Sequence, residues 1–291
     1  MTIDDANHPG YVLLLSCKNK PGIVAAVSAH LYDSGFNIEE SHQFDDKFSG
    51  RLFMRLRFES VRAIGVSQEQ VVEGFEPVAD RFEMEWSLQL VDQRMRVLIM
   101  VSRFGHCLND LLYRASTGAL RIDVPAIVSN HPDLESLAAH YDIPFHHIPV
   151  TPDTKGDAEE RVLKLIADER VDLTVLARYM QILSPELCRA LIGRAINIHH
   201  SMLPSFKGAR PYHQAHDRGV KMVGATAHYV TDELDEGPII EQEIARVDHT
   251  MSIAEFTALG RDAECRALAR AVRWHTENRV VANGHRTVVF R

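Results

Sequence analysis

Two different hydrophobic patterns follow one another along the chain, and the first occupies residues 1–92. Tyr11–Cys17 is a short apolar run that predicts a buried strand, and apolar residues then recur at helical spacing from Ile23 to Leu31. In Arg51–Phe58, large apolar residues alternate with arginines, which is typical of an antiparallel strand with one buried face.

Three further elements complete this first pattern. Asn37–Phe44 predicts a strand, Ser67 and Gln70 have the spacing of a helix capping box, and alternation over Trp86–Leu90 predicts a last strand. The order β-α-β-β-α-β is that of the ferredoxin-like fold. The sequence therefore predicts a small α+β domain over residues 1–92.

The second pattern begins after the polar link at residues 92–94 with Met95–Ser102, a continuous apolar run expected of a strand covered on both faces. Further strand candidates are Val124–Val128, Phe145–Val150, Leu173–Leu176, Ala195–Ile198, Val223–Tyr229 and Ile239–Ala245. Helical stretches lie between them or after them at Leu134–Tyr141, Ala158–Asp168, Pro185–Ile192 and Ile253–Trp274. This alternation predicts a Rossmann-like α/β domain with a mostly parallel sheet over residues 93–291.

Composition narrows the classes of function. The 32 Lys and Arg residues against 40 Asp and Glu give a net charge of -8, which disfavours a nucleic-acid partner. The four cysteines are far apart and form no metal-ribbon or disulfide spacing. The N-terminus lacks a signal-peptide pattern, and no apolar run approaches the ~20 residues of a membrane span. We expect a cytoplasmic protein without a membrane segment.

Polar residues replace the apolar pattern where the strand Ala195–Ile198 ends. Asn197 and His199 are two positions apart, so both side chains point to the same side of the strand. In open parallel sheets, ligands bind beyond the carboxyl ends of the strands. An amide and an imidazole placed there can polarise a carbonyl group, or they can simply cap the strand.

A second strand end is followed by an acidic loop. Asp232, Glu233, Asp235 and Glu236 place four carboxylates within five positions, before the turn Gly237–Pro238. Such a loop is either a solvated turn or a source of one carboxylate that orients a histidine or a water molecule.

These two segments carry a family resemblance. The pattern from Asn197 to Gly208 (NIHHSMLPSFKG), followed by the segment His228–Pro238 (HYVTDELDEGP), resembles the folate-dependent formyltransferases and, more closely, their formyltetrahydrofolate deformylase branch. The resemblance implies the catalytic residues Asn197, His199 and Asp235. It also implies contacts to the folate substrate from Met180, Gln181, Ile182, Leu183, His106, Thr231 and Leu234.

The N-terminal domain resembles the ACT domain, a regulatory module that commonly binds amino acids. Asn19, Pro21 and Gly22 match the short loop of that family and are candidates for contacts to an amino-acid effector. Sheets of this kind often associate, so a homo-oligomer is expected.

One loop separates the transferase and hydrolase alternatives. The related glycinamide ribonucleotide transferases have a Gly-rich loop after the first strand that cradles the acceptor's phosphate. Residues 102–109 (SRFGHCLN) contain a single glycine here. The resemblance therefore implies hydrolysis of 10-formyltetrahydrofolate to formate and tetrahydrofolate, with no cofactor. The formate would supply purine synthesis and balance one-carbon pools.

Four alternatives remain open from the sequence alone. The first is a formyltransferase that uses an amine acceptor. The second is an amino-acid sensor with an inactive catalytic domain. The third is a metal hydrolase built on the histidines near the two motifs, although no HExxH motif is present and no metal is expected. The fourth is a thiol nucleophile at Cys107.

Overall fold

The computed structural model describes residues 9–61, 66–204 and 211–291. The chain divides into two compact units at Gln93–Arg94, one residue after the boundary expected from the sequence. The second unit runs from Arg94 to Thr276 and includes 284–287, whereas 277–283 and 288–291 belong to the first unit. The hydrophobic pattern did not predict that the C-terminal segment belongs to the first unit.

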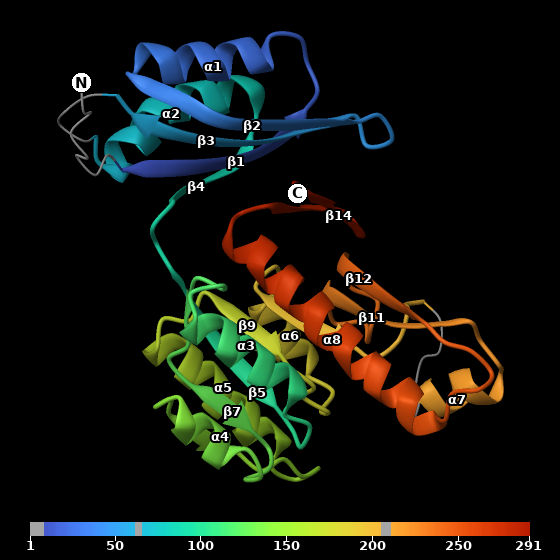
Figure 1. Ribbon diagram of the computed structural model, residues 1–291. Helices are drawn as coiled ribbons and strands as arrows, with labels where there is room; N and C mark the ends of the chain where they lie inside the picture. Colours follow the sequence, from blue (N-terminus) through green and yellow to red (C-terminus); the bar gives the residue numbers. More distant parts are fainter. Residues whose placement is uncertain (1–8, 62–65, 205–210) are drawn as a thin grey trace, which may run out of the picture. The chain divides into compact units, whose positions relative to one another are not determined.

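The first unit has the predicted β-α-β-β-α-β order, which is confirmed. Its elements are β1 (Gly10–Lys18), α1 (Ile23–Asp33), β2 (Phe36–Asp46), β3 (Arg51–Ser60), α2 (Gln68–Phe82) and β4 (Glu85–Leu90). The strands form an antiparallel sheet in the order β2-β3-β1-β4, and both helices lie on one of its faces (Figure 1). The turn that contains Asn19, Pro21 and Gly22 joins β1 to α1, and Gly22 has a φ of 93° there.

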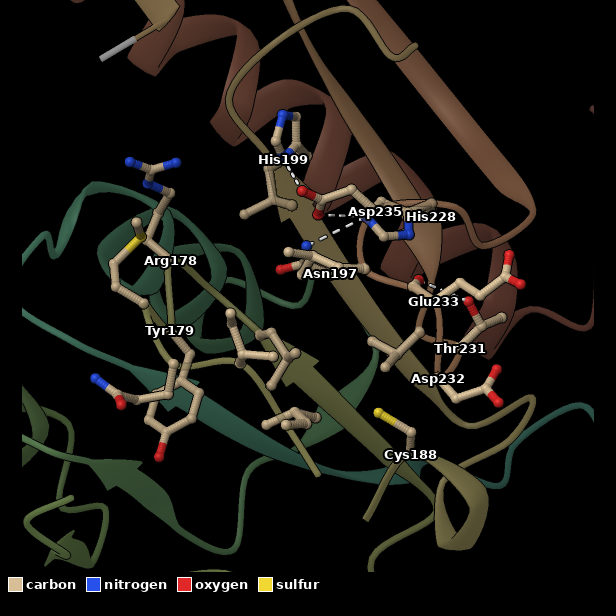
Figure 2. A pocket seen from close by; sticks show the side chains of 18 of the residues that line it. Arg178, Tyr179, Cys188, Asn197, His199, His228, Thr231, Asp232, Glu233 and Asp235 are labelled. Carbon is tan, nitrogen blue, oxygen red and sulfur yellow. Dashed lines mark hydrogen bonds and ion pairs between the residues drawn. The ribbon is translucent and has the colours of Figure 1, made fainter. Parts of the chain in front are cut away.

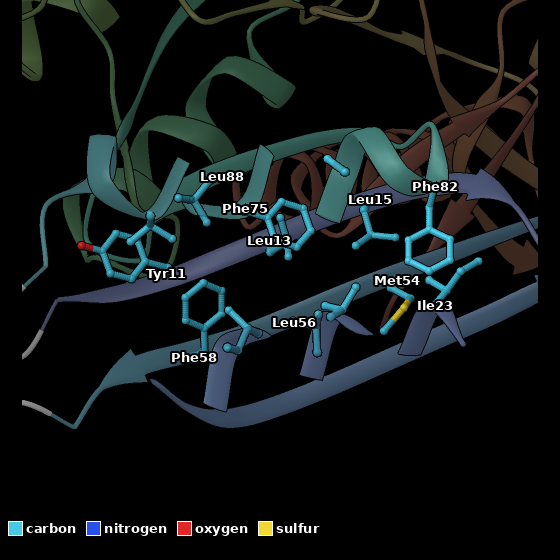
Figure 3. Packing of buried hydrophobic residues seen from close by; sticks show 14 of the residues in the cluster. Tyr11, Leu13, Leu15, Ile23, Met54, Leu56, Phe58, Phe75, Phe82 and Leu88 are labelled. Atoms are coloured by element: carbon cyan, nitrogen blue, oxygen red, sulfur yellow. The ribbon is translucent and has the colours of Figure 1, made fainter. Parts of the chain in front are cut away.

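The core of this unit lies between the sheet and its two helices (Figure 3). Tyr11, Leu13 and Leu15 of β1 face this core, because side chains at alternate positions share one face of a strand. The Ser67 side chain accepts a hydrogen bond from the Gln70 backbone N–H, and the Ser67 N–H donates to the Gln70 side chain. The predicted capping box therefore begins α2.

Strand β3 differs from the prediction of one buried face. Phe53 and Arg55 point away from the helices, yet they are only 0% and 3% exposed. The Arg55 guanidinium donates to the backbone carbonyls of Glu277 and Asn278 and to the Glu40 carboxylate at 2.8 Å. The C-terminal segment of the first unit thus covers part of a face that alternation alone would leave to solvent.

The second unit alternates strands and helices as expected. Its first half contains β5 (Met95–Val101), α3 (His106–Ser116), β6 (Ile122–Asp123), β7 (Ile127–Ser129), α4 (Glu135–His140), β8 (Phe145–His147) and α5 (Lys155–Asp168). Its second half contains β9 (Leu173–Leu176), α6 (Pro185–Ala190), β10 (Ala195–His199), α7 (Pro211–Asp217), β11 (Met222–Tyr229), β12 (Ile239–Arg246) and α8 (Ile253–Thr276). The ribbon of β13 (Val280–Asn283) and β14 (Arg286–Val289) ends the chain.

The main sheet has the order β12-β11-β10-β9-β5-β7-β8. Strands β8, β7, β5, β9 and β10 are parallel, while β11 and β12 are antiparallel to their neighbours. One hydrophobic core packs α5 and α6 against the sheet, and α8 lies along β11 and β12 (Figure 1). The single strand predicted over Val124–Val128 was wrong: β6 and β7 are separate short strands on either side of Pro125, which has no backbone N–H to donate.

This topology fixes where a ligand can bind. The chain leaves β5 toward β7 and β8 on one side and later returns to β9 and β10 on the other. The carboxyl ends of β9 and β10 therefore lie beside the point where the strand order reverses, the usual ligand position in such sheets. No helix in the described ranges is long and apolar enough to cross a membrane. Residues 205–208 of the recognised motif lie outside the described residues.

Candidate active site

A pocket of about 250 Å³ opens at the carboxyl ends of β9 and β10 (Figure 2). Three segments form its walls, namely the residues after β9, the end of β10 and the acidic loop between β11 and β12. The pocket is lined by Leu176, Arg178, Tyr179, Met180, Gln181, Ile182, Leu183, Cys188, Asn197, Ile198, His199, His200, His228, Val230, Thr231, Asp232, Glu233, Leu234 and Asp235. The three predicted catalytic residues therefore share one pocket.

Asn197 is held in place by a neighbouring strand. It pairs in register with His228 of β11, and its amide nitrogen lies 3.2 Å from Nε2 of that histidine. Nδ1 of His228 lies 2.9 Å from the Tyr229 carbonyl oxygen, which can only accept, so Nδ1 carries a proton and donates it there. Nε2 then accepts one N–H of the Asn197 amide, and the amide's second N–H remains available to a ligand.

His199 contacts the acidic loop. Its Nδ1 lies 3.2 Å from one carboxylate oxygen of Asp235, and the other oxygen lies 3.7 Å from His228 Nε2. His199 is only 5% exposed, and its Nε2 is buried without a hydrogen-bond partner among the described residues. The pocket therefore contains an imidazole with one nitrogen fixed by a carboxylate and the other free to act on a ligand.

Asp235 contacts both histidines from the acidic loop. Its backbone has a φ of 57°, a left-handed conformation that Asp tolerates better than most residues. Burial opposes ionisation of this side chain, but its contacts, above all the hydrogen bond with His199, outweigh that effect and lower its pKa. Asp235 is therefore ionised near neutral pH and favours a proton on Nδ1 of His199.

The residues expected to contact folate surround this centre. Met180, Gln181, Ile182 and Leu183 line the pocket after β9, and Thr231 and Leu234 line it from the acidic loop. Met180, Ile182 and Leu234 are 52%, 63% and 60% exposed, so an apolar rim surrounds the polar centre. The backbone N–H of Met180 is already used, because it donates to the Ser102 hydroxyl at 2.9 Å.

His106 does not line this pocket. Its Nε2 lies 2.7 Å from a carboxylate oxygen of Glu264, a residue of α8 that is 1% exposed. Arg178 Nε lies 3.3 Å from the same oxygen, and the Tyr212 hydroxyl donates to the other one. Burial opposes ionisation of Glu264, but these partners lower its pKa. His106 is thus part of a buried polar cluster together with Arg178, Glu264 and Tyr212.

The thiol of Cys107 lies beside this cluster. In the described part of the chain, His106, Cys107 and Glu264 form the one group of three that could hold a metal ion. This group fits a cation poorly, because Arg178 lies next to Glu264 and both carboxylate oxygens already have donors. Hydrogen bonding to Cys265 and burial raise the pKa of the Cys107 thiol well above its ordinary value, so it is a poor nucleophile and a poor metal ligand.

Four residues in or beside the pocket were not assigned a role in it from the sequence. His228 belongs to the recognised motif, but only its strand pairing with Asn197 reveals its contact. Arg178 and Glu264 are 86 positions apart in the sequence, and no spacing rule connects them. His200 also lines the pocket; burial and the nearby Arg178 lower its pKa to about 4, so it is neutral.

Comparison with known proteins identifies the family to which this fold and this pocket belong. Residues 95–272 match the formyl transferase family model. The chain is 53% identical over 281 residues to a formyltetrahydrofolate deformylase of Corynebacterium sp., covering 97% of this chain and 98% of that one. It is 45% identical over 287 residues to a protein of the same name from Bacillus subtilis, covering 98% of this chain and 95% of that one.

Solved structures agree. The chain matches the formyltetrahydrofolate deformylase of Burkholderia mallei with a TM-score of 0.93 and 51% identity, over 97% of this chain and all (100%) of the other. A glycinamide ribonucleotide transformylase of Symbiobacterium toebii matches with a TM-score of 0.65 and 28% identity over 70% of this chain and 98% of that one. The chain therefore belongs to the formyl transferase family and, within it, to the formyltetrahydrofolate deformylases.

Proposed function

We propose that this chain hydrolyses 10-formyltetrahydrofolate to formate and tetrahydrofolate, with Asn197, His199 and Asp235 as the catalytic residues. The observation that supports this most is the shared pocket of an oriented amide, a buried imidazole and an ionised carboxylate. The full-length similarity to proteins named deformylase supports the same reaction.

Asn197 acts on the formyl oxygen. One of its N–H groups is directed to His228, and the second donates to the oxygen as it becomes an oxyanion. A donor placed in this way typically contributes about 3–4 kcal/mol to the stability of the transition state. His228 is a positioning residue, because it holds the amide and does not itself meet the formyl group.

His199 carries the proton. Asp235 is a poor proton acceptor because of its lowered pKa, but it stabilises a positive charge on the ring of His199. Nε2 of His199 takes a proton from the attacking water, the C–N10 bond then breaks, and the same nitrogen delivers the proton to N10. From the sequence, His199 was expected to polarise the carbonyl group together with Asn197.

Water is the acceptor in this proposal. The loop after β5 has one glycine, and the helix that follows it begins with His106, which is bonded to the buried Glu264. A backbone cradle for a phosphate requires a close approach that this loop does not favour. An amine acceptor would thus lack its anchor, and water would take its place.

The direct test measures both products. Purified protein is incubated with 10-formyltetrahydrofolate, with and without glycinamide ribonucleotide, and formate and tetrahydrofolate are quantified. We expect equal amounts of the two products without any acceptor. Turnover that depends on the ribonucleotide would identify a transferase instead, and complete inactivity would favour a sensor. Dialysis against a chelator should leave the rate unchanged, because no step requires a metal or a cofactor.

Several finer points belong to the same proposal. The formate supplies purine synthesis and the reaction balances one-carbon pools in the cytoplasm. The first unit acts as an ACT-like regulatory domain, with Asn19, Pro21 and Gly22 near an amino-acid effector, and the chain forms a homo-oligomer. Titration of amino acids against the hydrolysis rate, together with the molar mass in solution, would test these points.

A further inference from the structure

We propose that Arg178 is a carboxylate-binding residue of the catalytic pocket and that the carboxylate it receives is the formate produced there. This inference rests on the proposed hydrolysis and assigns a place to its anionic product. It concerns a residue that lines the same pocket as Asn197, His199 and Asp235 but takes no part in the proton transfer (Figure 2).

The first observation is the state of the guanidinium. Arg178 is 9% exposed, and its Nε is buried without a hydrogen-bond partner among the described residues. The Glu264 oxygen 3.3 Å away balances its charge without forming a hydrogen bond with Nε. A buried guanidinium with an unpartnered N–H is costly to maintain, so a ligand that supplies acceptors is expected.

The second observation is the backbone of the same residue. Arg178 has a φ of 67°, a conformation that residues other than Gly, Asn and Asp adopt rarely. Its carbonyl accepts a hydrogen bond from the Ser102 N–H at 3.2 Å, which ties this turn to the end of β5. Backbone strain of this kind is concentrated at ligand-binding and catalytic positions.

The charges around Arg178 suit a small anion that must later leave. The reaction converts a neutral formyl group into formic acid, which ionises to formate near neutral pH beside the carboxylate of Asp235. The two anions, formate and the Asp235 carboxylate, repel each other. Arg178 lines the described part of the pocket and carries a positive charge, so it offsets this repulsion. Glu264 competes for the same guanidinium and thereby limits how tightly formate is held.

Formate also matches the donors in shape. Its two oxygens can accept two parallel N–H groups of a guanidinium, a bidentate arrangement that the ammonium of a lysine cannot provide. The unpartnered Nε2 of His199 lines the same pocket and is a further donor once protonated. A glutamate carboxylate of the folate substrate has the same chemistry, and the experiment must separate these two sources.

The experiment measures inhibition by sodium formate of tetrahydrofolate production, at constant ionic strength set with chloride. Wild type is compared with Arg178→Gln, Arg178→Lys and Arg261→Gln. Arg261 is the matched control, because its guanidinium lies over the same Phe104 ring as that of Arg178 but does not line the pocket. A parallel series uses 10-formyltetrahydropteroate, which lacks the glutamate tail.

We expect formate to inhibit wild type and Arg261→Gln equally, and to inhibit Arg178→Gln at least tenfold more weakly, with either substrate. Arg178→Lys should also lose affinity for formate, because it keeps the charge but not the planar fork. The glutamate source would be indicated, and the proposal overturned, if Arg178→Gln raised KM only for the glutamate-containing substrate and left formate inhibition intact. Absence of formate inhibition in wild type would also overturn it.

A binding measurement covers variants that turn over poorly. Line broadening of ¹³C-formate by the protein reports binding without catalysis, and circular dichroism verifies that each variant is folded. Arg178→Lys serves in place of Arg178→Gln if the latter does not fold. Wild type that releases no formate from the substrate, yet broadens the formate signal through Arg178, would refute the hydrolysis and leave the anion site standing.

Discussion

At the scale of single residues, its contacts with two histidines distinguish Asp235 from the three other carboxylates of the acidic loop. Asp232, Glu233 and Glu236 share its loop, and among the ion pairs of the described residues it is Asp235 whose oxygens lie near His199 and His228. Its lowered pKa keeps it charged, so it orients the His199 ring and stabilises an imidazolium.

Asp235→Asn should therefore reduce kcat by about 10⁴-fold, the loss typical of replacing a carboxylate that orients a catalytic histidine. KM should change little, because the apolar rim of the pocket is untouched. Formate release at saturating substrate is the measurement, and Asp232→Asn is the control because this carboxylate lines the pocket without contacting a histidine in any described ion pair. A rate within tenfold of wild type would show that Asp235 does not orient the catalytic histidine.

At the scale of secondary-structure elements, the turn between β11 and β12 determines where Asp235 lies. Gly237 follows the acidic loop, and a Cβ at this position would lie 1.7 Å from the Tyr229 carbonyl oxygen. That carbonyl also accepts the His228 Nδ1 proton. The close approach of Gly237 to the Tyr229 backbone thus helps to position both Asp235 and His228.

Gly237→Ala should displace this turn, lower kcat by at least about tenfold and reduce the free energy of unfolding by about 1–3 kcal/mol through overpacking. Urea denaturation and formate release would measure the two effects. Gly156→Ala in α5 is the matched control, because its Cβ would meet nothing within 4 Å and alanine favours a helix. If the two variants had the same kcat and the same free energy of unfolding, the close approach of Gly237 to the Tyr229 carbonyl would not determine the position of this turn.

The contact between α8 and β11 makes stability depend on pH. The Tyr229 hydroxyl lies 2.7 Å from Nδ1 of His275, and burial lowers the pKa of this histidine to about 4. An unfolded histidine has a pKa near ~6.5, so the unfolded chain binds more protons between these values. The stabilising contribution is complete above pH ~6.5 and is lost as the pH falls toward 4.

His275→Gln should reduce this dependence, because glutamine can still accept from Tyr229 but does not titrate. The measurement is the free energy of unfolding of both proteins between pH 4 and 7. The difference between them should change with a slope of up to about 1.4 kcal/mol per pH unit in this window. Parallel curves would mean that His275 does not titrate differently on folding.

At the scale of the whole molecule, the first unit is built from two parts of the chain that are far apart in the sequence. After α8 the chain returns to the first unit, where residues 277–283 and 288–291 belong. The buried Arg55 guanidinium has the backbone carbonyls of Glu277 and Asn278 as acceptors, and the Asn283 amide donates to Asp46 at 2.8 Å.

A chain that ends at Thr276 should have a less stable first unit, because Arg55 loses two acceptors whose hydrogen bonds to a charged group contribute about 1.5–3 kcal/mol each. Trp86 packs against the core of the first unit, and Trp274 is the other tryptophan of the chain. In a Trp274→Phe background, the Trp86 fluorescence transition in urea should therefore move to lower concentration. Arg55→Met in the full-length chain is the matched variant, and an unchanged midpoint in both would contradict the prediction.

The sequence by itself determined the local elements and the residues that carry the chemistry. Alternation, helical spacing and the Ser67–Gln70 spacing depend on neighbouring positions, so they predicted most of the strands, the capping box and both fold classes. Asn197 and His199 were identifiable because a strand ends at them and its alternation places them on one side. The resemblance then connected them to Asp235.

Tertiary structure decided what depends on residues far apart in the chain. It gave Asp235, which the resemblance had already implied, its contact with His199, and it gave Asn197 its contact with His228. It placed His106 against Glu264 and not in the substrate pocket. It also brought Arg178 and Glu264 together and covered Arg55 with the end of the chain. These outcomes follow from strand pairing, chain crossover and burial, which act through space and leave no periodic signal in the sequence.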